Sequence, residues 1–229
     1  MNSFLLTASC VAVTVGSYCL SRVAYRKRPS PLTTPVFFST TLIILLLLAA
    51  RLEFDDYSAA SDVMTFLLGP ATVALAVPLY KNRRVVVDHG IAALVGLALG
   101  CVSTMAAVIV IAKLLQLSPM IVNSLSVKSV TVAIAIELST VVEGNPSLAA
   151  GFVIATGMLG AMLGPWLMNA MRITHPVARG LSLGTISHGQ GTAQAALEGE
   201  LQGSIAGVAM GVAAVFTAFA VPVVIAVLS

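Results

Sequence analysis

Long apolar stretches make up most of this sequence and leave few residues that suit an aqueous surface. They occupy residues 3–21, 34–50, 62–80, 90–114, 119–142, 148–171 and 204–228. Each is close to the roughly 20 residues that a helix needs to cross a bilayer. Only 9% of the 229 residues are charged, against about 25% in soluble domains. We therefore expect an all-α integral membrane protein, a polytopic helix bundle with about seven hydrophobic segments and the lipid bilayer as its main solvent.

The chain length favours one integral membrane domain over residues 1–229, with little left for a soluble domain. Residues 1–30 would supply the first span and a basic loop. The first apolar run has no basic segment before it, which is typical of an uncleaved span and not of a signal peptide. Cys10, Cys19 and Cys101 lie in apolar runs without CxxC spacing, so we expect small buried side chains and no metal or cofactor.

Loop charges indicate how the chain crosses the membrane. The loops Arg22–Arg28 and Lys81–Arg84 are basic, and the loop Arg51–Asp62 between them is acidic. Because basic loops stay in the cytoplasm, the N-terminus should lie outside, and the net charge of +3 reports orientation and not nucleic-acid binding. Arg172 and Arg179 would also favour the inside, which seven simple spans do not allow. One later segment is therefore expected to be broken or re-entrant.

The stretch NSLSVKSVT, residues 123–131, places Lys128 between apolar sequences that keep it from reaching the headgroups easily. A charge at the bilayer centre costs about 2.5–3.5 kcal/mol, so this lysine needs an anion or a carboxylate. One interpretation is an unwound segment in which Lys128, Ser129 and Thr131 bind an anionic substrate and Asn123 satisfies freed backbone groups. The other interpretation is structural: Lys128 snorkels to the interface or pairs with a glutamate.

Glu137 and Glu143 are the glutamates that follow Lys128. On a continuous helix the nine residues from Lys128 to Glu137 would rise about 13.5 Å, so a direct pair requires a break between them. Two interpretations of Glu137 stay open: a proton carrier in coupled transport, or an interfacial glutamate near the end of its span.

The octapeptide TISHGQGT, residues 185–192, brings polar side chains together between two apolar stretches. Non-helical backbone survives at membrane depth only against protein or a water-filled cavity, and N–H groups at the start of the next helix would bind an anion. His188 can carry a proton near neutral pH, which makes it a second candidate for proton coupling. We expect substrate contacts from Ser187, His188, Gly189, Gly191 and Thr192. The alternative is a packing helix whose small residues let its neighbours approach.

Gly69 and Pro70, together with Pro78, predict a kinked or broken helix, and we add Pro70 to the expected substrate-binding residues. The sequence ATVALAVP at 71–78 matches VTVAIAIE at 130–137 in four of eight positions. Secondary transporters are often built from repeats with interrupted helices, although two unrelated apolar helices would explain the match as well.

Gly203, Gly207 and Gly211 recur at four-residue intervals in the last apolar stretch, a pattern typical of tight helix packing or of a homodimer. Glu198 and Glu200 precede them and either mark the aqueous edge or line an entrance. The sequence shows no pattern of a nucleophile with a base, so we do not expect an enzyme.

Four segments resemble the LrgB/CidB family of bacterial membrane proteins, which includes the carboxyl half of the plastid glycolate/glycerate translocator. They are GPATVALAVPLYK (69–81), KSVTVAIAIELS (128–139), LGPWL (163–167) and ARGLSLGTISHGQGTAQAALEGELQGSIAGVAMG (178–211). The resemblance covers roughly residues 31–228, and its most specific part is His-Gly-x-Gly-Thr with the Glu-Gly-Glu that follows. Relatives often continue the KSVT motif with Thr-Pro where this chain has Val132-Ala133, which weakens the expectation of a sharp helix break after Thr131.

The resemblance implies a multi-pass protein of the bacterial cytoplasmic membrane with one of two functions. Some members are holin-like or antiholin-like modulators of murein hydrolase export and cell lysis, acting with a small LrgA/CidA-type membrane partner. Others move short-chain carboxylates such as pyruvate, glycolate and glycerate. The residues favour the second function, because Lys128, the hydroxyl groups and His188 suit a small anion with a carboxylate and a hydroxyl or keto oxygen. We therefore expect a proton-coupled secondary transporter of monocarboxylates, with the lysis modulator as the alternative.

Overall fold

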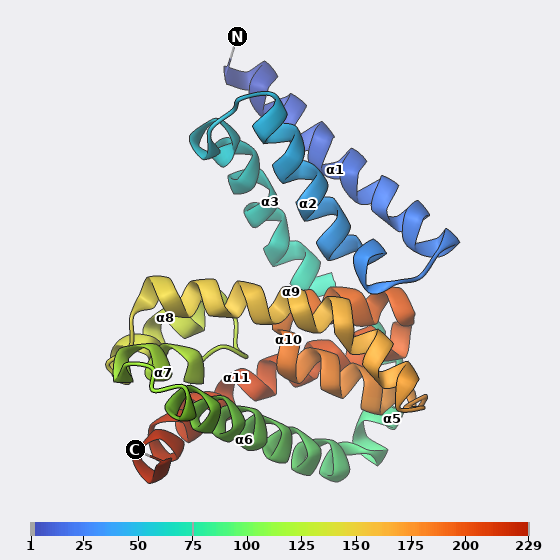
Figure 1. The fold of residues 1–229 in the computed structure, drawn as a ribbon. Helices are drawn as coiled ribbons and strands as arrows, with labels where there is room; N and C mark the ends of the chain where they lie inside the picture. The colour runs from blue at the N-terminus through green and yellow to red at the C-terminus, as the bar shows by residue number, and fades with distance from the viewer. Residues whose placement is uncertain (1–2, 75, 229) are drawn as a thin grey trace. The chain divides into compact units, whose positions relative to one another are not determined.

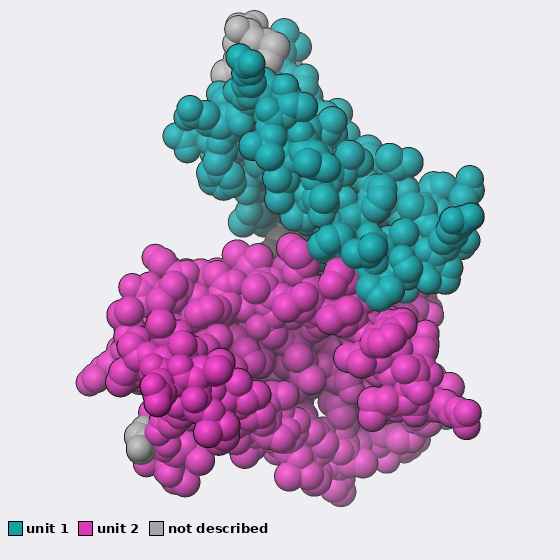
Figure 2. All heavy atoms as spheres, viewed as in Figure 1, with its two compact units in different colours: residues 1–76 teal, residues 77–229 magenta. Residues whose placement is uncertain are grey.

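A computed structural model describes residues 3–74 and 76–228, and every regular element in those ranges is helical. This confirms the predicted all-α class. The chain divides into two compact units, Met1–Ala76 and Val77–Ser229, which Figure 2 draws in different colours. Among the described residues, four helices are long and apolar enough to cross a membrane. Each of them falls on one of the predicted apolar segments.

The first unit is built from three helices and one short turn of 3-10 helix. Its elements are α1 (Ser3–Lys27), η1 (Pro31–Thr33), α2 (Pro35–Ala49) and α3 (Phe54–Ala74). α1 packs against both α2 and α3, and Thr14 Oγ1 lies 2.9 Å from Tyr57 Oη in a hydrogen bond between α1 and α3. α3 continues through Pro70, where the sequence predicted a break or kink, so the helix is not broken at this residue. The next helix is α4 (Ala76–Lys81), and Leu75 lies outside the described residues.

Three long helices frame the second unit: α6 (Gly90–Leu114), α9 (Pro146–Ala170) and α11 (Glu200–Leu228). The shorter helices are α5 (Arg83–Asp88), α7 (Pro119–Ser126), α8 (Val132–Val141) and α10 (Pro176–Glu198). α10 lies between α6 and α9, and α11 packs on α10 and α6 (Figure 1). A buried cluster dominated by valine and alanine side chains fills the space between them. The apolar segment predicted at 119–142 forms two short helices, α7 and α8, and not one span.

α10 is a helical hairpin, and the chain reverses its direction at His188. This residue has φ 40° and ψ −129°, far from helical values. Arg179 Nε and Nη2 donate to Glu198 Oε2 and Oε1 at 2.7 and 2.8 Å, although a straight helix would hold residues 19 apart about 28 Å from each other. The two arms touch at Gly191, where a Cβ would lie 2.0 Å from Leu183 O. The octapeptide thus forms the tip of a tight hairpin.

α7 and α8 form a second hairpin around residues 127–131. Asn123 Nδ2 donates to Val142 O at 2.6 Å, again across 19 residues. Ser124 Oγ accepts a hydrogen bond from Asn145 N at 2.8 Å, which holds the base of this hairpin against the start of α9. The broken later segment that the charge pattern predicted is found here, because the chain returns to the end from which it entered.

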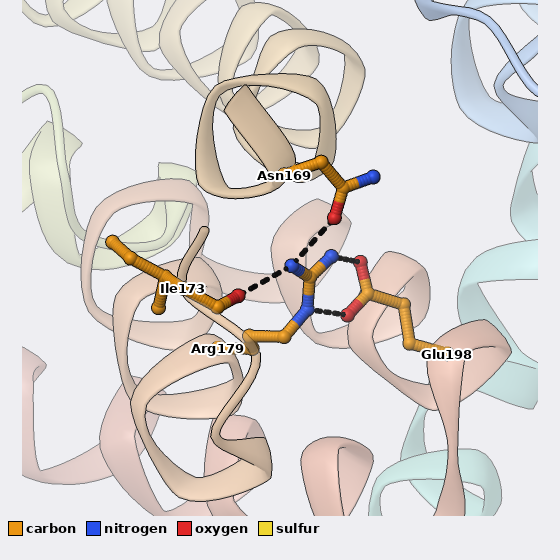
Figure 3. A network of polar contacts seen from close by, with 4 residues as sticks. All are labelled: Asn169, Ile173, Arg179 and Glu198. Carbon is orange, nitrogen blue, oxygen red and sulfur yellow. Dashed lines mark hydrogen bonds and ion pairs between the residues drawn. The ribbon is translucent and has the colours of Figure 1, made fainter. Parts of the chain in front are cut away.

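A buried polar network closes the base of the α10 hairpin (Figure 3). Besides its paired bonds to Glu198, Arg179 donates from Nη1 to Asn169 Oδ1 and to Ile173 O, both at 2.9 Å. Arg179 is only 9% exposed. Because Asn169 lies in the last turn of α9, the network fixes the base of α10 to the end of α9.

The two hairpins enter the second unit from opposite ends. His89, which precedes α6, stacks near His175, which precedes α10, with ring centroids 5.5 Å apart. Lys113 at the end of α6 donates to Leu228 O at the end of α11. We call these the His89 end, where the α10 hairpin has its base, and the Lys113 end, where α7 and α8 have theirs. The polar tips of both hairpins therefore lie inside the unit.

Glu198→Ala should destabilise the protein, because it leaves the buried Arg179 charge without its carboxylate. Removing one partner of a buried ion pair costs about 3–5 kcal/mol, which corresponds to a fall of roughly 6–20 °C in melting temperature. Glu200→Ala is the matched control, since the 3.7 Å pair of Glu200 with Lys81 is exposed on both sides and is worth about 0–1 kcal/mol. Circular dichroism of the purified protein in detergent measures both. Equal melting temperatures would contradict the role of the pair in closing the hairpin.

Gly184→Ala should separate α10 from α11, because a Cβ at this position would lie 2.2 Å from Ala206 O in the backbone of α11. Overpacking of this kind costs about 1–3 kcal/mol. Gly211→Ala is the control: no atom lies within 4 Å of a Cβ there, and alanine favours a helix over glycine by about 0.5–1 kcal/mol. The melting temperature should fall in the first variant and hold or rise in the second. If both variants melted alike, the close approach of the two helices would be unnecessary.

Candidate functional site

The tip of the α7–α8 hairpin holds Lys128 in non-helical backbone between two helices. Its ammonium group donates to Ser129 Oγ at 3.1 Å and forms no ion pair with a carboxylate in residues 3–74 and 76–228. Ser129 is buried, and Thr131 is the N-cap of α8, where its carbonyl accepts from Ala135 N at 2.9 Å. The predicted unwound segment is confirmed, and α8 begins at Val132 although no proline follows Thr131.

The tip of the α10 hairpin lies against the middle of α9. His188 Nε2 donates to Val153 O at 3.1 Å, and a Cβ at Gly157 would lie 2.5 Å from that nitrogen. A Cβ at Gly160 would lie 1.8 Å from Ser187 Oγ. The two glycines therefore provide the space that the tip occupies. Ser187 and His188 are 1% and 6% exposed.

His188 itself makes the reversal, and the glycines beside it do not. A residue with φ 40° occupies a region that glycine prefers, and the strain costs other residues on the order of 1–3 kcal/mol. None of the described glycines has a positive φ in that region. Gly184 and Gly191 instead allow close contact with neighbouring backbone, which was the other predicted role. The octapeptide is otherwise helical, which keeps its backbone hydrogen bonds satisfied inside a membrane.

Gly189 and Thr192 lie in the returning arm of α10. Thr192 Oγ1 donates to His188 O at 2.9 Å and lies 3.9 Å from Met210 Sδ in α11. This hydroxyl group therefore supports the turn of the hairpin. Gly189 is exposed, and no atom lies within 4 Å of a Cβ built there. Free space thus adjoins the tip at this residue.

The two tips share one buried core. The valines on both sides of Lys128 at positions 127 and 130 belong to the same buried cluster as Val153, whose carbonyl binds His188. Cys101 of α6 is also a member of this cluster. The structure thus brings the two polar segments into the interior of the same unit.

Three predicted residues lie apart from the tips. Asn123 closes the base of the α7–α8 hairpin through its bond to Val142 O. Glu137 is exposed on α8 and forms no ion pair within the described residues, and the same holds for Glu143. A pair between Lys128 and either glutamate is therefore not observed. Pro70 belongs to the first unit.

Two buried residues, one in α6 and one in α11, carry no sequence signal. Cys101 and Thr217 are each 3% exposed, and the Thr217 side chain lies within hydrogen-bonding reach of the Cys101 thiol. Both occur in apolar helices, where a single cysteine or threonine is an ordinary core residue. Thr185, the first residue of the octapeptide, is 4% exposed, and its Oγ1 is buried without a hydrogen-bond partner. Only the folded structure draws attention to Cys101 and Thr217, whereas Thr185 belongs to the polar octapeptide that the sequence singled out.

The chemistry of this arrangement suits anion binding and proton exchange. Lys128 supplies a positive charge that no carboxylate among the described residues pairs with, and Ser129 supplies a hydroxyl group beside it. His188 Nε2 carries the hydrogen that Val153 O accepts, so its Nδ1 is the nitrogen that can take up or release a proton. A small carboxylate could pair with the ammonium and accept hydrogen bonds from the hydroxyl groups.

Comparison with known proteins agrees with this picture of a membrane protein. The LrgB-like family model matches residues 14–227. The chain is 32% identical to the uncharacterized protein YxaC of Bacillus subtilis (strain 168) over 222 residues, which cover 95% of this chain and 96% of YxaC. It is 33% identical to the uncharacterized protein YwbG of the same organism over 183 residues, covering 80% of this chain and 81% of YwbG. No solved structure matches it. The chain therefore belongs to the LrgB-like family.

Proposed function

We propose that this protein is a secondary transporter that moves small monocarboxylates, such as pyruvate, glycolate or glycerate, together with a proton. The observation that supports it most is the Lys128 ammonium group, which bonds a hydroxyl and has no carboxylate partner among the described residues. A cation without a counter-charge is costly inside a membrane, and a bound anion removes that cost. The Ser129 hydroxyl would bind the substrate beside it.

The pair of hairpins supports alternating access to such a site. Transporters often bind substrate near the bilayer midplane, between interrupted helices that come from different halves of the chain. Here the hairpin that carries Lys128 has its base at the Lys113 end, and the hairpin that carries His188 has its base at the His89 end. Movement of either hairpin would therefore open the site to one side of the membrane.

The same arrangement supports a multi-pass orientation in the bacterial cytoplasmic membrane. If α7 and α8 re-enter, α6 and α9 cross in opposite directions, and Lys81–Arg84, Arg172 and Arg179 all fall at the His89 end. The conflict with the positive-inside rule that seven simple spans create is then removed. We assign the His89 end to the cytoplasm.

The alternative is modulation of cell lysis, the function that the resemblance to the LrgB/CidB family also implies. We would then expect a homodimer and an LrgA/CidA-type membrane partner, and this function would depend on helix surfaces that face away from the core. Gly211 has open space around it, whereas Gly203 packs against Ala196 of the same chain. A lysine without a counter-charge in the interior is not needed for that function, so we favour transport.

Lys128→Ala should remove the charge that holds the substrate carboxylate. A hydrogen bond to a charged group is worth about 1.5–3 kcal/mol, so uptake of labelled pyruvate or glycolate into proteoliposomes should fall at least about tenfold. Lys113→Ala, at the end of α6, is the matched control and should keep uptake near that of the parent. Equal uptake by the two variants would reject Lys128 as the binding group.

His188→Gly separates the imidazole from the backbone turn. Glycine adopts φ 40° without strain, so this variant should keep the fold and the exchange of substrate between loaded vesicles and the medium. It should lose the acceleration of uptake by an inward proton gradient. His188→Ala retains the strained turn and should melt at a lower temperature than His188→Gly. Proton-driven uptake that survives in His188→Gly would exclude His188 as the coupling residue.

A further inference from the structure

An apolar pocket of about 210 Å³ lies between α6, α10 and α11 in the second unit. It begins beside His89, and the other residues that line it carry apolar side chains or none. Figure 2 shows the surface of this unit hollowed between α6 and α10. The pocket therefore leads from the His89 end toward the interior of the unit.

The helix faces that line this pocket continue inward to polar side chains. Residues four apart lie on the same face of a helix. Leu181 of the pocket and Thr185 therefore lie on one face of α10, and Leu97 of the pocket and Cys101 lie on one face of α6. The Thr217 side chain of α11 lies within hydrogen-bonding reach of the Cys101 thiol. A polar group from each of the three helices thus lies beyond the inner end of the pocket.

Thr185 is a buried polar residue of the α10 hairpin that lies beside α6. Its methyl carbon would lie 4.0 Å from a Cβ at Gly100, the neighbour of Cys101, and its Oγ1 is buried without a hydrogen-bond partner. A buried hydroxyl group without a partner is costly, so the site needs a group that this chain does not supply. Cys101 belongs to the same buried cluster as Val127 and Val130, the valines on both sides of Lys128 in the other hairpin. Within the described residues, neither the Thr185 hydroxyl group nor the Lys128 ammonium group has a carboxylate partner.

We propose that Thr185, Cys101 and Thr217 form a second wall of the Lys128 site, and that a monocarboxylate reaches this wall from the His89 end through the apolar pocket. The inference rests on the proposed function and adds to it a route and a restriction on the substrate. Lys128 neutralises one carboxylate. A second carboxylate would lie against apolar side chains, where an unpaired charge is costly. The site accepts small acids with one carboxylate and rejects dicarboxylates.

Cys101 offers a measurement that does not depend on transport. With Cys10 and Cys19 changed to serine, Cys101 is the only thiol of the chain, and its modification in lipid nanodiscs can be followed by mass spectrometry. The anionic reagent sulfonatoethyl methanethiosulfonate should react at least about tenfold faster than its cationic trimethylammonioethyl counterpart, because Lys128 attracts anions. Lys128→Gln should remove this preference.

Substrate protection tests the wall and the restriction on charge. Pyruvate should slow the modification of Cys101, and succinate should not. Thr185→Val should raise the pyruvate concentration needed for protection about tenfold, because it removes the hydroxyl group. Thr104→Val is the control on α6, since Thr104 Oγ1 already donates to Gly100 O at 2.9 Å, and it should leave protection unchanged. Equal rates for the two reagents, equal protection by succinate and pyruvate, or no modification of the folded protein would overturn the inference.

The outcomes also separate this inference from the proposed function. A protein that takes up pyruvate in proteoliposomes, but shows no charge preference at Cys101, keeps the transport function and loses the second wall. Charge preference and protection without any uptake would keep the site and reject transport.

Discussion

The buried pair between Arg179 and Glu198 determines the shape of the second unit, because it holds both ends of α10 at one point. A 23-residue helix that crossed the unit in one direction would carry its polar residues out to the far end. Folded back, it delivers Ser187 and His188 to the middle of α9. Taking two charges out of water is costly, and the paired geometry with the further bonds to Asn169 and Ile173 offsets that cost.

The membrane adds the requirement that every backbone N–H and C=O group finds a partner within the protein. The two hairpins meet it differently. α10 reverses through a single non-helical residue, so nearly all of its backbone stays within helical arms. The α7–α8 hairpin has several non-helical residues at its tip, and side chains bind carbonyl groups in or just after the last turn of each of its helices. Asn123 Nδ2 donates to Val142 O, and Ser126 Oγ donates to Asn123 O at 2.6 Å.

The sequence located both tips because a lysine and a histidine are conspicuous in so apolar a chain, and charge counting showed that one later segment must turn back. It did not show how the chain closes. That depends on Arg179 meeting Glu198 and on Asn123 meeting Val142, each 19 residues away, and no local pattern encodes such a contact. The conformation of the octapeptide was predicted only in part, since non-helical backbone was expected along it and the structure confines that backbone to His188.

The histidine at the point of reversal is best explained by its side chain. Glycine would make the same turn without strain, and this segment is already rich in glycine, so a strained residue there costs on the order of 1–3 kcal/mol that the fold could avoid. Strain of this kind persists where the surrounding structure fixes the residue and its side chain has a task. At the deepest point of the hairpin, the bond from Nε2 to Val153 O fixes the ring and leaves Nδ1 for a proton. The backbone thus bears a cost in order to place an imidazole inside the membrane.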